Sequence, residues 1–502
     1  MSARKLPEGW MTSHLSEVCS KPQYGYTTKS NSIGDVKFLR TTDITKGAVD
    51  WSCVPYCMDA PEDVSKYQLQ DRDIVISRAG SVGFSFLVKK PPGQVVFASY
   101  LIRFKPSNYF SENYLKRFLE SSDYWNQLSS MSSGNAVQNV NAQKLSTLIV
   151  PIAPMAEQKI IAEKLDTLLA QVDNTKARLE QIPKILKRFR QAVLERAVNG
   201  KLTESWRDAI GEMISAEEII TEIKKYRKEL LSTEGSSKST ESKRQLAKID
   251  KHCVNAPEIN LPKGWVWTTF LQSMEKVVDC HNKTAPYVNQ GIHLIRTPDI
   301  RNGVISLKNT KYIDNDTYLY WSKRCPPRSG DIIFTREAPM GEAGIIPENT
   351  VLCMGQRMML LRPIPQYLNN KYVLLNILSS SFQTRMISQA IGTGVKHLRV
   401  ADVESLTYSL PPIEEQHEIV RHVEQLFAYA DTIEKQVNNA LARVNNLTQS
   451  ILAKAFRGEL TAQWRAENPD LISGENSATA LLEKIKAERA VSGSKKNARK
   501  KA

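Results

Sequence analysis

The sequence predicts an α/β (α+β) protein made of two globular domains in tandem repeat, separated by two long antiparallel coiled-coil helices. Three observations predict this architecture. Matching motifs recur 255 to 258 residues apart, short β-rich runs interrupted by turn-forming residues occur in both copies, and an apolar heptad stripe follows each copy. A chain of 502 residues with 41% hydrophobic content can build several such cores.

Each copy opens with the same short motifs. Leu6-Pro-Glu-Gly-Trp10 recurs as Leu261-Pro-Lys-Gly-Trp265, and Phe38-Leu-Arg-Thr-Thr-Asp-Ile44 recurs as Leu294-Ile-Arg-Thr-Pro-Asp-Ile300. Runs such as 73–77 and 331–335 alternate with turn residues. We therefore expect a mixed helix-and-strand domain at the start of each copy.

Each copy also closes with matching motifs. Pro154-Met-Ala-Glu-Gln158 corresponds to Pro412-Ile-Glu-Glu-Gln416. After the helix, Ala197-Val-Asn-Gly-Lys-Leu-Thr-Glu-Ser-Trp-Arg207 corresponds to Ala455-Phe-Arg-Gly-Glu-Leu-Thr-Ala-Gln-Trp-Arg465. These motifs predict six parts: a first domain at 1–155, a spacer helix at 156–207, a short helix and Ser/Lys-rich linker at 208–260, a second domain at 261–413, a spacer helix at 414–465, and a short helix with a basic tail at 466–502.

Apolar residues at alternating steps of four and three predict the two spacer helices. The first stripe consists of Ile161, Leu165, Leu168, Val172, Thr175, Leu179, Ile182, Leu186, Phe189 and Val193. The second consists of Ile419, Val423, Leu426, Ala430, Ile433, Val437, Ala440, Val444, Leu447 and Ile451. We expect the two stripes to pack on each other, antiparallel if a two-fold axis relates the copies.

Three local features modify this expectation. Pro183 lies inside the first stripe and predicts a kink or a break, because proline removes a helix hydrogen bond. Seven of the eleven residues from Ser232 to Ser242 are Ser or Thr, which favours a flexible linker. The tail from Lys484 carries eight Lys or Arg and is interpreted as disordered and solvated.

Composition limits the function classes. The net charge of +15 makes a polyanionic partner the first to test. No run approaches the roughly 18 apolar residues of a membrane span, and the first ten residues have no apolar core, so we expect a cytoplasmic protein without membrane contact. The seven cysteines form no Cys-x-x-Cys pair, which favours reduced thiols over disulfides or a zinc ribbon, and no metal site is expected.

Catalytic motifs are missing from the sequence. There is no phosphate-binding Gly-x4-Gly-Lys-[Ser/Thr] loop, and Gly200-Lys-Leu-Thr203 lacks the hydroxyl directly after Lys. The three Pro-Pro pairs lack the flanking residues with which an amino-methyltransferase holds a flipped adenine. We therefore expect no catalytic residue and no cofactor in this chain.

This arrangement of motifs resembles the specificity subunit of type I restriction-modification systems over nearly the whole chain. Within the domains, 76–83, 334–341 and 355–357 look like patches that recur in that family. Where the second copy has Gln356-Arg357, the first has Ser99-Tyr100, so the two copies are not expected to read DNA with the same residues.

The resemblance implies a non-enzymatic reader of double-stranded DNA with two target-recognition domains, each binding one half of a split, asymmetric site. It implies two modification (methyltransferase) subunits that dock on the helices, and restriction (translocase/endonuclease) subunits in the same complex. S-adenosylmethionine, ATP and Mg²⁺ would then belong to those partners, which methylate adenine or cleave DNA.

Arginine and amide side chains on loops are the best candidates for reading bases. The candidates are Arg78, Ser81, Asn135, Gln138 and Asn139 in the first domain, and Arg336, Gln356, Arg357, Lys396 and His397 in the second. Arg78 and Arg336 could instead hold phosphates. Arg40 and Arg296, in the repeated Arg-Thr-x-Asp-Ile, are interpreted as a scaffold paired with Asp43 and Asp299.

Two other classes compete with this hypothesis. A standalone DNA-modifying enzyme would need the missing catalytic motifs, and a coiled-coil scaffold that does not bind DNA would not need two diverged globular copies. If the helices act as a spacer, the 33 residues from Ile161 to Val193 span about 50 Å at roughly 1.5 Å per residue, comparable with one turn of DNA.

Overall fold

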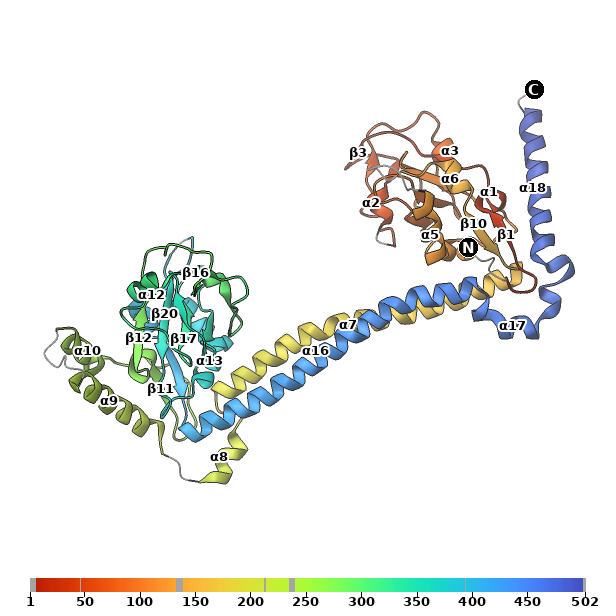
Figure 1. The fold of residues 1–502 in the computed structure, drawn as a ribbon. Helices are drawn as coiled ribbons and strands as arrows, with labels where there is room; N and C mark the ends of the chain where they lie inside the picture. The colour runs from red at the N-terminus through yellow and green to blue at the C-terminus, as the bar shows by residue number, and fades with distance from the viewer. Residues whose placement is uncertain are drawn as a thin grey trace. The chain divides into compact units, whose positions relative to one another are not determined.

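The computed structural model describes residues 6–45, 47–131, 139–211, 214–233, 240–392 and 394–499 (Figure 1). The chain forms two compact units. Unit 1 consists of residues 1–180 and 438–502, and unit 2 of residues 181–437. Each unit therefore combines one globular domain with segments of both long helices.

Unit 1 contains three small sheets in its globular domain. An antiparallel sheet has the order β2-β9-β6-β7, a mixed sheet has the order β3-β5-β4-β8 with β4 and β8 parallel, and β1 pairs with β10. The strand bounds are β1 Met11–His14, β2 Gln23–Tyr24, β3 Ser30–Asn31, β4 Lys37–Leu39, β5 Tyr56–Cys57, β6 Ile74–Ser77, β7 Ser85–Leu87, β8 Val95–Phe97, β9 Leu101–Phe104 and β10 Ile149–Ile152.

Short helices surround these sheets, and the end of the chain adds two more to the unit. Their bounds are α1 Leu15–Val18, α2 Thr41–Ile44, α3 Val64–Tyr67, α4 Glu112–Phe118, α5 Ser122–Met131, α6 Ala142–Ser146, α17 Ala462–Glu467 and α18 Ala478–Arg499, with 3-10 turns η2 Glu459–Thr461, η3 Pro469–Leu471 and η4 Gly474–Asn476. α18 lies beside α1, where Leu481 and Ile485 join the core of the domain (Figure 1).

Unit 2 repeats this plan. The sheet β12-β20-β17-β18 corresponds to β2-β9-β6-β7, β16-β13-β19 corresponds to β5-β4-β8, and β11 pairs with β21 as β1 pairs with β10, while β14 and β15 form a hairpin. The bounds are β11 Val266–Thr269, β12 Lys276–Asp279, β13 Ile292–Ile295, β14 Ile300–Arg301, β15 Val304–Ile305, β16 Lys311–Ile313, β17 Ile332–Thr335, β18 Ala343–Ile345, β19 Leu352–Met354, β20 Met358–Arg362 and β21 Thr407–Leu410.

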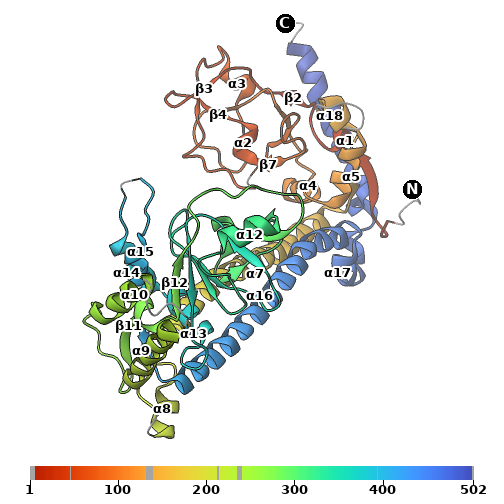
Figure 2. The same cartoon turned by 60° about the vertical axis from the view of Figure 1, so that its left-hand side comes forward.

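The helices of unit 2 include a pair that precedes its globular domain. The bounds are α8 Glu204–Ile210, α9 Ala216–Thr233, α10 Thr240–Lys251, α11 Phe270–Ser273, α12 Asn315–Trp321, α13 Asn370–Leu378, α14 Ser380–Gln389 and α15 Val400–Glu404, with the 3-10 turn η1 Thr297–Asp299. Figure 2 shows α9 and α10 side by side next to β11.

The two long helices are α7, Met155–Val198, and α16, Ile413–Phe456. In unit 1 the beginning of α7 packs on the end of α16, with Ile161 and Leu165 in the same cluster as Leu452. In unit 2 the end of α7 packs on the beginning of α16, through Val193 and Val423. The helices are therefore antiparallel, and the predicted stripes form the contact. Two positions of these stripes, Thr175 and Leu447, are instead exposed.

Three expectations about these segments change. Helix α7 continues through Pro183, so the break is absent. Helix α10 occupies part of the predicted linker, while 234–239 lie outside the described residues. The tail predicted to be disordered is helical as far as Arg499, because the apolar residues at 478, 481, 482 and 485 lie on one side of α18 and are buried. No helix in the described part of the chain is long and apolar enough to cross a membrane.

Candidate nucleic-acid interface

Arg78 directly follows strand β6 and joins three segments of the first domain. Its N–H donates to the carbonyl of Tyr100 at 2.8 Å, and its carbonyl accepts from the N–H of Val140 at 3.0 Å. The guanidinium lies over the ring of Tyr24, 5.3 Å from the centroid. Among the described residues no acceptor reaches its buried Nε. The side chain thus has no carboxylate partner in the described part of this domain.

Two other candidates of the first domain lie close to Arg78. Asn139 forms a β-bridge with Ala79, and its side chain is exposed, like that of Ser81 in the turn after β6. The structure therefore brings Arg78, Ser81 and Asn139 together. The candidates Asn135 and Gln138 lie outside the described residues.

Arg336 has the same backbone frame in the second domain. Its N–H donates to the carbonyl of Arg357 at 2.8 Å, and its carbonyl accepts from the N–H of Leu398 at 3.1 Å. The side chain differs from that of Arg78, because Nη2 contacts Asp279 at 2.9 Å and Nη1 donates to the carbonyl of Leu398 at 3.1 Å. With 16% of its side chain exposed, Arg336 is held by an ion pair.

The neighbours of these two arginines occupy corresponding strand positions. Tyr24 in β2 faces Ile102 of β9, and Asp279 in β12 faces Met359 of β20. The same place in the fold therefore carries an aromatic ring in one domain and a carboxylate in the other. In the second domain the carboxylate of Asp279 offsets the charge of the arginine, whereas the ring of Tyr24 supplies no opposite charge to the first.

The remaining candidates of the second domain lie on two adjoining loops. The Gln356 amide donates to the carbonyl of Asn282 at 2.9 Å, whereas Arg357 is exposed, with Nε 3.6 Å from Glu337. Arg357 adopts a left-handed conformation, φ +69°, which is uncommon for a residue with a side chain. Its guanidinium is the most accessible of the second domain's candidate arginines.

Lys396 and His397 belong to a short hairpin beside this loop. His397 exchanges backbone hydrogen bonds with Ile391 at 3.0 and 3.1 Å and bridges to Glu337. Lys396 is exposed. The structure therefore gathers Arg336, Arg357 and His397, as it gathers their counterparts in the first domain.

The interpretation of Arg40 and Arg296 as scaffold residues is confirmed. Arg40 donates to both oxygens of Asp43, at 2.9 and 3.1 Å. Arg296 donates to both oxygens of Asp299, at 3.3 and 3.4 Å. Each aspartate also accepts the backbone N–H of its arginine and so begins a helical turn.

Sequence reasoning missed Tyr24 and Asp279, and it matched Tyr100 to Arg357 without naming Tyr100 as a candidate. Tyr100, at the end of the loop opposite Arg78, is 59% exposed. An exposed aromatic side chain next to an arginine is a surface on which a nucleic-acid base can stack. The signal that could have revealed Tyr24 and Asp279 was the offset of 255 residues between them, which matches the repeat, because a differing side chain at a matched position marks a variable surface.

The repeated end motifs meet at a buried carboxylate in unit 1. Glu157 is fully buried, and its oxygens accept from the Trp10 indole at 2.7 Å, from the Thr461 hydroxyl at 2.6 Å and from Arg465 at 2.5 Å. Arg465 also lies over the Trp10 ring, 5.9 Å from its centroid. We call this set the Glu157 clasp.

Unit 2 has the same arrangement around Glu415. The Trp265 indole and the Thr203 hydroxyl donate to this buried carboxylate at 2.8 and 2.7 Å, and Arg207 forms an ion pair with it. We call this set the Glu415 clasp. Each clasp therefore joins the start of one repeat to the segment that follows the other repeat's helix within the same unit.

A family model described as the type I restriction modification DNA specificity domain matches residues 7–184 and 276–443. The type I restriction enzyme EcoKI specificity subunit of Escherichia coli K12 is 40% identical over the full length of both chains. The StySPI specificity subunit of Salmonella potsdam is 40% identical over the full length of both chains. The EcoBI specificity subunit of Escherichia coli is 38% identical over 99% of this chain and 96% of its own.

Solved structures share the fold. The HsdS subunit of Thermoanaerobacter tengcongensis has a TM-score of 0.55 at 18% identity, covering 91% of this chain and 99% of its own. A chain from a structure of complex assembly in a type I R-M system has a TM-score of 0.57 at 18% identity, covering 91% of this chain and all of its own.

Proposed function

The chain belongs to the type I restriction-modification specificity subunits, and on that premise we propose that each globular domain binds one half of a bipartite, asymmetric DNA site through the loops around Arg78 or Arg336. Members of this family are non-catalytic recognition subunits. The comparisons give no support to a standalone enzyme or to a scaffold that does not bind DNA.

One observation carries the proposal. The two domains hold an arginine in the same backbone frame but surround it with different side chains, Tyr24 and Tyr100 in one and Asp279 and Arg357 in the other. A shared frame with different exposed groups is what two half-sites of different sequence require, because phosphate contacts position a protein while base contacts specify.

The partners follow from the same proposal. Two modification subunits would dock on this chain and bring S-adenosylmethionine for adenine methylation, and restriction subunits would add ATP- and Mg²⁺-dependent translocation and cleavage. The complex would act in the cytoplasm. Its two half-sites would be separated by an unread spacer whose length depends on α7 and α16.

Selection of binding sites from random duplexes by the complex with its modification subunits tests the reading of DNA. Arg357→Ala is expected to relax one base pair in one half-site, at a cost of ~1–3 kcal/mol, and Tyr100→Ala to weaken the other half-site. Each variant is the control for the other. A single uninterrupted site, or both variants changing the same half, would overturn the proposal.

A further experiment tests the spacer. One heptad inserted at matched places in α7 and α16 adds about 10 Å to the coil at roughly 1.5 Å per residue. The preferred spacer should lengthen while both half-site sequences stay the same. Altered half-site sequences with an unchanged spacer would contradict a spacing role for the helices.

A further inference from the structure

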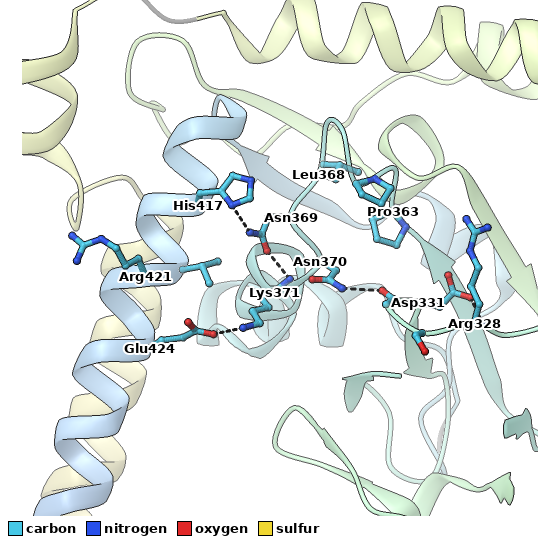
Figure 3. A pocket seen from close by; sticks show the side chains of 14 residues that line it. Arg328, Asp331, Pro363, Leu368, Asn369, Asn370, Lys371, His417, Arg421 and Glu424 are labelled. Atoms are coloured by element: carbon cyan, nitrogen blue, oxygen red, sulfur yellow. Dashed lines mark hydrogen bonds and ion pairs between the residues drawn. The ribbon is translucent and has the colours of Figure 1, made fainter. Parts of the chain in front are cut away.

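A cavity of about 460 Å³ opens in unit 2 between the second recognition domain and helix α16. Figure 3 shows its walls: the turn before β17 with Arg328, Leu368 before α13 and Lys371 in its first turn, and the first turns of α16 with His417 and Arg421. Leu368, Val420 and two prolines provide its apolar surface.

The repeat shows what fills the corresponding place in unit 1. Arg72 and Gly330 occupy the same position, since each N–H donates at 3.0 Å across a hairpin, to Val88 and to Ile346 respectively. Both residues are left-handed, with φ +70° and +88°. In unit 1 the turn therefore carries a long side chain where unit 2 has a glycine beside the cavity.

Four groups of unit 1 hold the Arg72 guanidinium, and 33% of the side chain remains exposed. Its guanidinium donates to Glu112 and to the Asn108 amide oxygen, each at 3.1 Å, and to the carbonyls of Ser107 and Phe110 at 3.4 Å. Chain residues of unit 1 thus take up the room that is open in unit 2.

Two residues beside the cavity are less acidic than the residues at the matching positions of unit 1. Asn370 stands where unit 1 has Glu112, and Lys371 stands where it has Asn113. The Asn370 amide donates to the Gly330 carbonyl at 3.0 Å. The position of Glu112 therefore carries no carboxylate in unit 2, and the two carboxylates that do line the cavity, Asp331 and Glu424, are each paired with a cation.

Two further cations line the opening. Arg328 replaces Gln70 and Arg421 replaces Glu163. The side chains of Arg328, Lys371 and Arg421 are 58%, 56% and 51% exposed. Each of the three is paired with an acidic neighbour, and only the pair of Lys371 with Glu424 has both side chains exposed. Such a surface pair stabilises little, so an incoming carboxylate can compete for Lys371.

The position of the cavity favours a protein ligand over DNA. Gly330 lies before strand β17, whereas Arg336 lies after it, so the cavity and the candidate nucleic-acid interface are at opposite ends of the strand. Helix α16 forms one wall. Cations around an apolar floor suit an acidic side chain carried by an apolar protein segment.

We propose that this cavity receives an acidic side chain from a segment of one modification subunit, and that the two modification subunits therefore bind the chain unequally. The proposal rests on the proposed function, because it takes its partner from there. The subunit at unit 2 inserts a side chain into the cavity, while the one at unit 1 meets a surface already filled by Arg72.

Substitutions at Gly330 test the contribution of the cavity to binding separately from that of the surrounding surface. Gly330→Arg places in unit 2 the side chain that unit 1 already has, in the same backbone conformation. Gly330→Ala is the matched control, because it adds the same backbone strain but leaves the cavity open; the nearest atom to the new Cβ is the Asn370 amide nitrogen at 3.5 Å. Thermal unfolding of both variants checks that unit 2 stays folded.

Titration of the full-length chain with purified modification subunit, followed by native mass spectrometry, is the measurement. Gly330→Arg should weaken one of two binding steps at least tenfold and leave the other unchanged, while Gly330→Ala stays within about threefold of wild type. Lys371→Gln, which keeps the cavity open, should reduce the salt dependence of the same step.

Each other outcome overturns the proposal in a distinguishable way. If both binding steps are unchanged in Gly330→Arg, the cavity is not part of the interface with the modification subunits, while the proposed function stands. Intact assembly with weakened binding of duplex DNA would assign the cavity to a phosphate. Failure of the wild-type chain to bind modification subunits would contradict the proposed function itself.

Discussion

At the residue scale, the two arginines of the repeated patch have different electrostatic surroundings. Arg336 is paired with Asp279 at 2.9 Å, whereas Arg78 lies over Tyr24. A charge that is already neutralised releases fewer counterions from DNA than a charge without a carboxylate neighbour. Both domains therefore share the motif, but we expect its contribution to DNA affinity to differ between them.

Salt titrations of DNA affinity can measure this difference. Arg78→Ala should weaken binding to all sequences and reduce the slope of log affinity against log salt by about one. Arg336→Ala should change that slope less and should destabilise unit 2 by ~1–3 kcal/mol, because it leaves the half-buried Asp279 without its cation. Equal slope changes for both variants would contradict the assignment.

A buried carboxyl group gives unit 1 a dependence on pH. Asp73 is 1% exposed, and burial raises its pKa, although the Gln70 N–H and Arg103 act in the opposite direction. Among the described residues its Oδ1 has no hydrogen-bond partner. Because the folded-state pKa is above the unfolded value, the associated stability is present at low pH and is lost as the pH rises through the folded pKa.

The substitution Asp73→Asn should remove this dependence. The difference in unfolding free energy between wild type and Asp73→Asn should fall as the pH is raised from below 4 to 7, at about 1.4 kcal/mol for each unit of pKa shift. Urea unfolding at a series of pH values checks it. If the difference in unfolding free energy is constant or rises over this pH range, the pKa of the Asp73 carboxyl is not raised in the folded protein.

At the scale of elements, the long helices were the most predictable part of the fold. The predicted spacer segments, 156–207 and 414–465, begin within one residue of α7 and α16, because the apolar repeat is dense over many turns, but the long helices themselves end earlier, at Val198 and Phe456. The small sheets could not be predicted in this way. Strands of two to five residues leave little local pattern, and their order depends on pairings between distant segments.

The same reason explains what was missed in the candidate site. The arginine loops were predicted from matched motifs, but Tyr24 and Asp279 reach them only through pairing of β2 with β9 and of β12 with β20. In the tail from Lys484 the local signal was Ile485, which continues the apolar positions 478, 481 and 482 of the predicted short helix and which the Lys-rich composition concealed. Composition describes a surface, whereas spacing reveals a buried face.

Pro183 lies on the exposed side of a continuous helix, so its replacement should stabilise the coil. Proline lacks the N–H that would bond to the carbonyl of Leu179 and crowds that carbonyl. Pro183→Ala is expected to raise the unfolding free energy of unit 2 by ~1–3 kcal/mol. Lys184→Ala, at the next exposed position, is the control and should change it by less than ~0.5 kcal/mol. Lower stability for Pro183→Ala would contradict this account.

At the scale of the whole molecule, each unit combines segments of both repeats. The Glu157 clasp in unit 1 uses Arg465, which follows the helix of the second repeat, and the Glu415 clasp in unit 2 uses Arg207, which follows the helix of the first. The arginine that follows the helix of each repeat therefore lies in the unit that contains the globular domain of the other repeat. This exchange explains why the Leu-Thr-x-x-Trp-Arg motif recurs with so little change after each helix.

Removing one arginine should therefore destabilise the domain that belongs to the other repeat. Arg465→Ala leaves the charge of Glu157 buried without its cation, which should cost ~3 kcal/mol in unit 1, and Arg207→Ala should do the same to Glu415 in unit 2. Hydrogen exchange on the full-length chain measures this separately for each unit. Arg465→Ala should lower the protection of β1 and β10 and spare β11 and β21, with the reverse for Arg207→Ala. If each variant instead lowered protection in the domain of its own repeat, or in both domains equally, the clasps would not be what ties the end of one repeat to the beginning of the other.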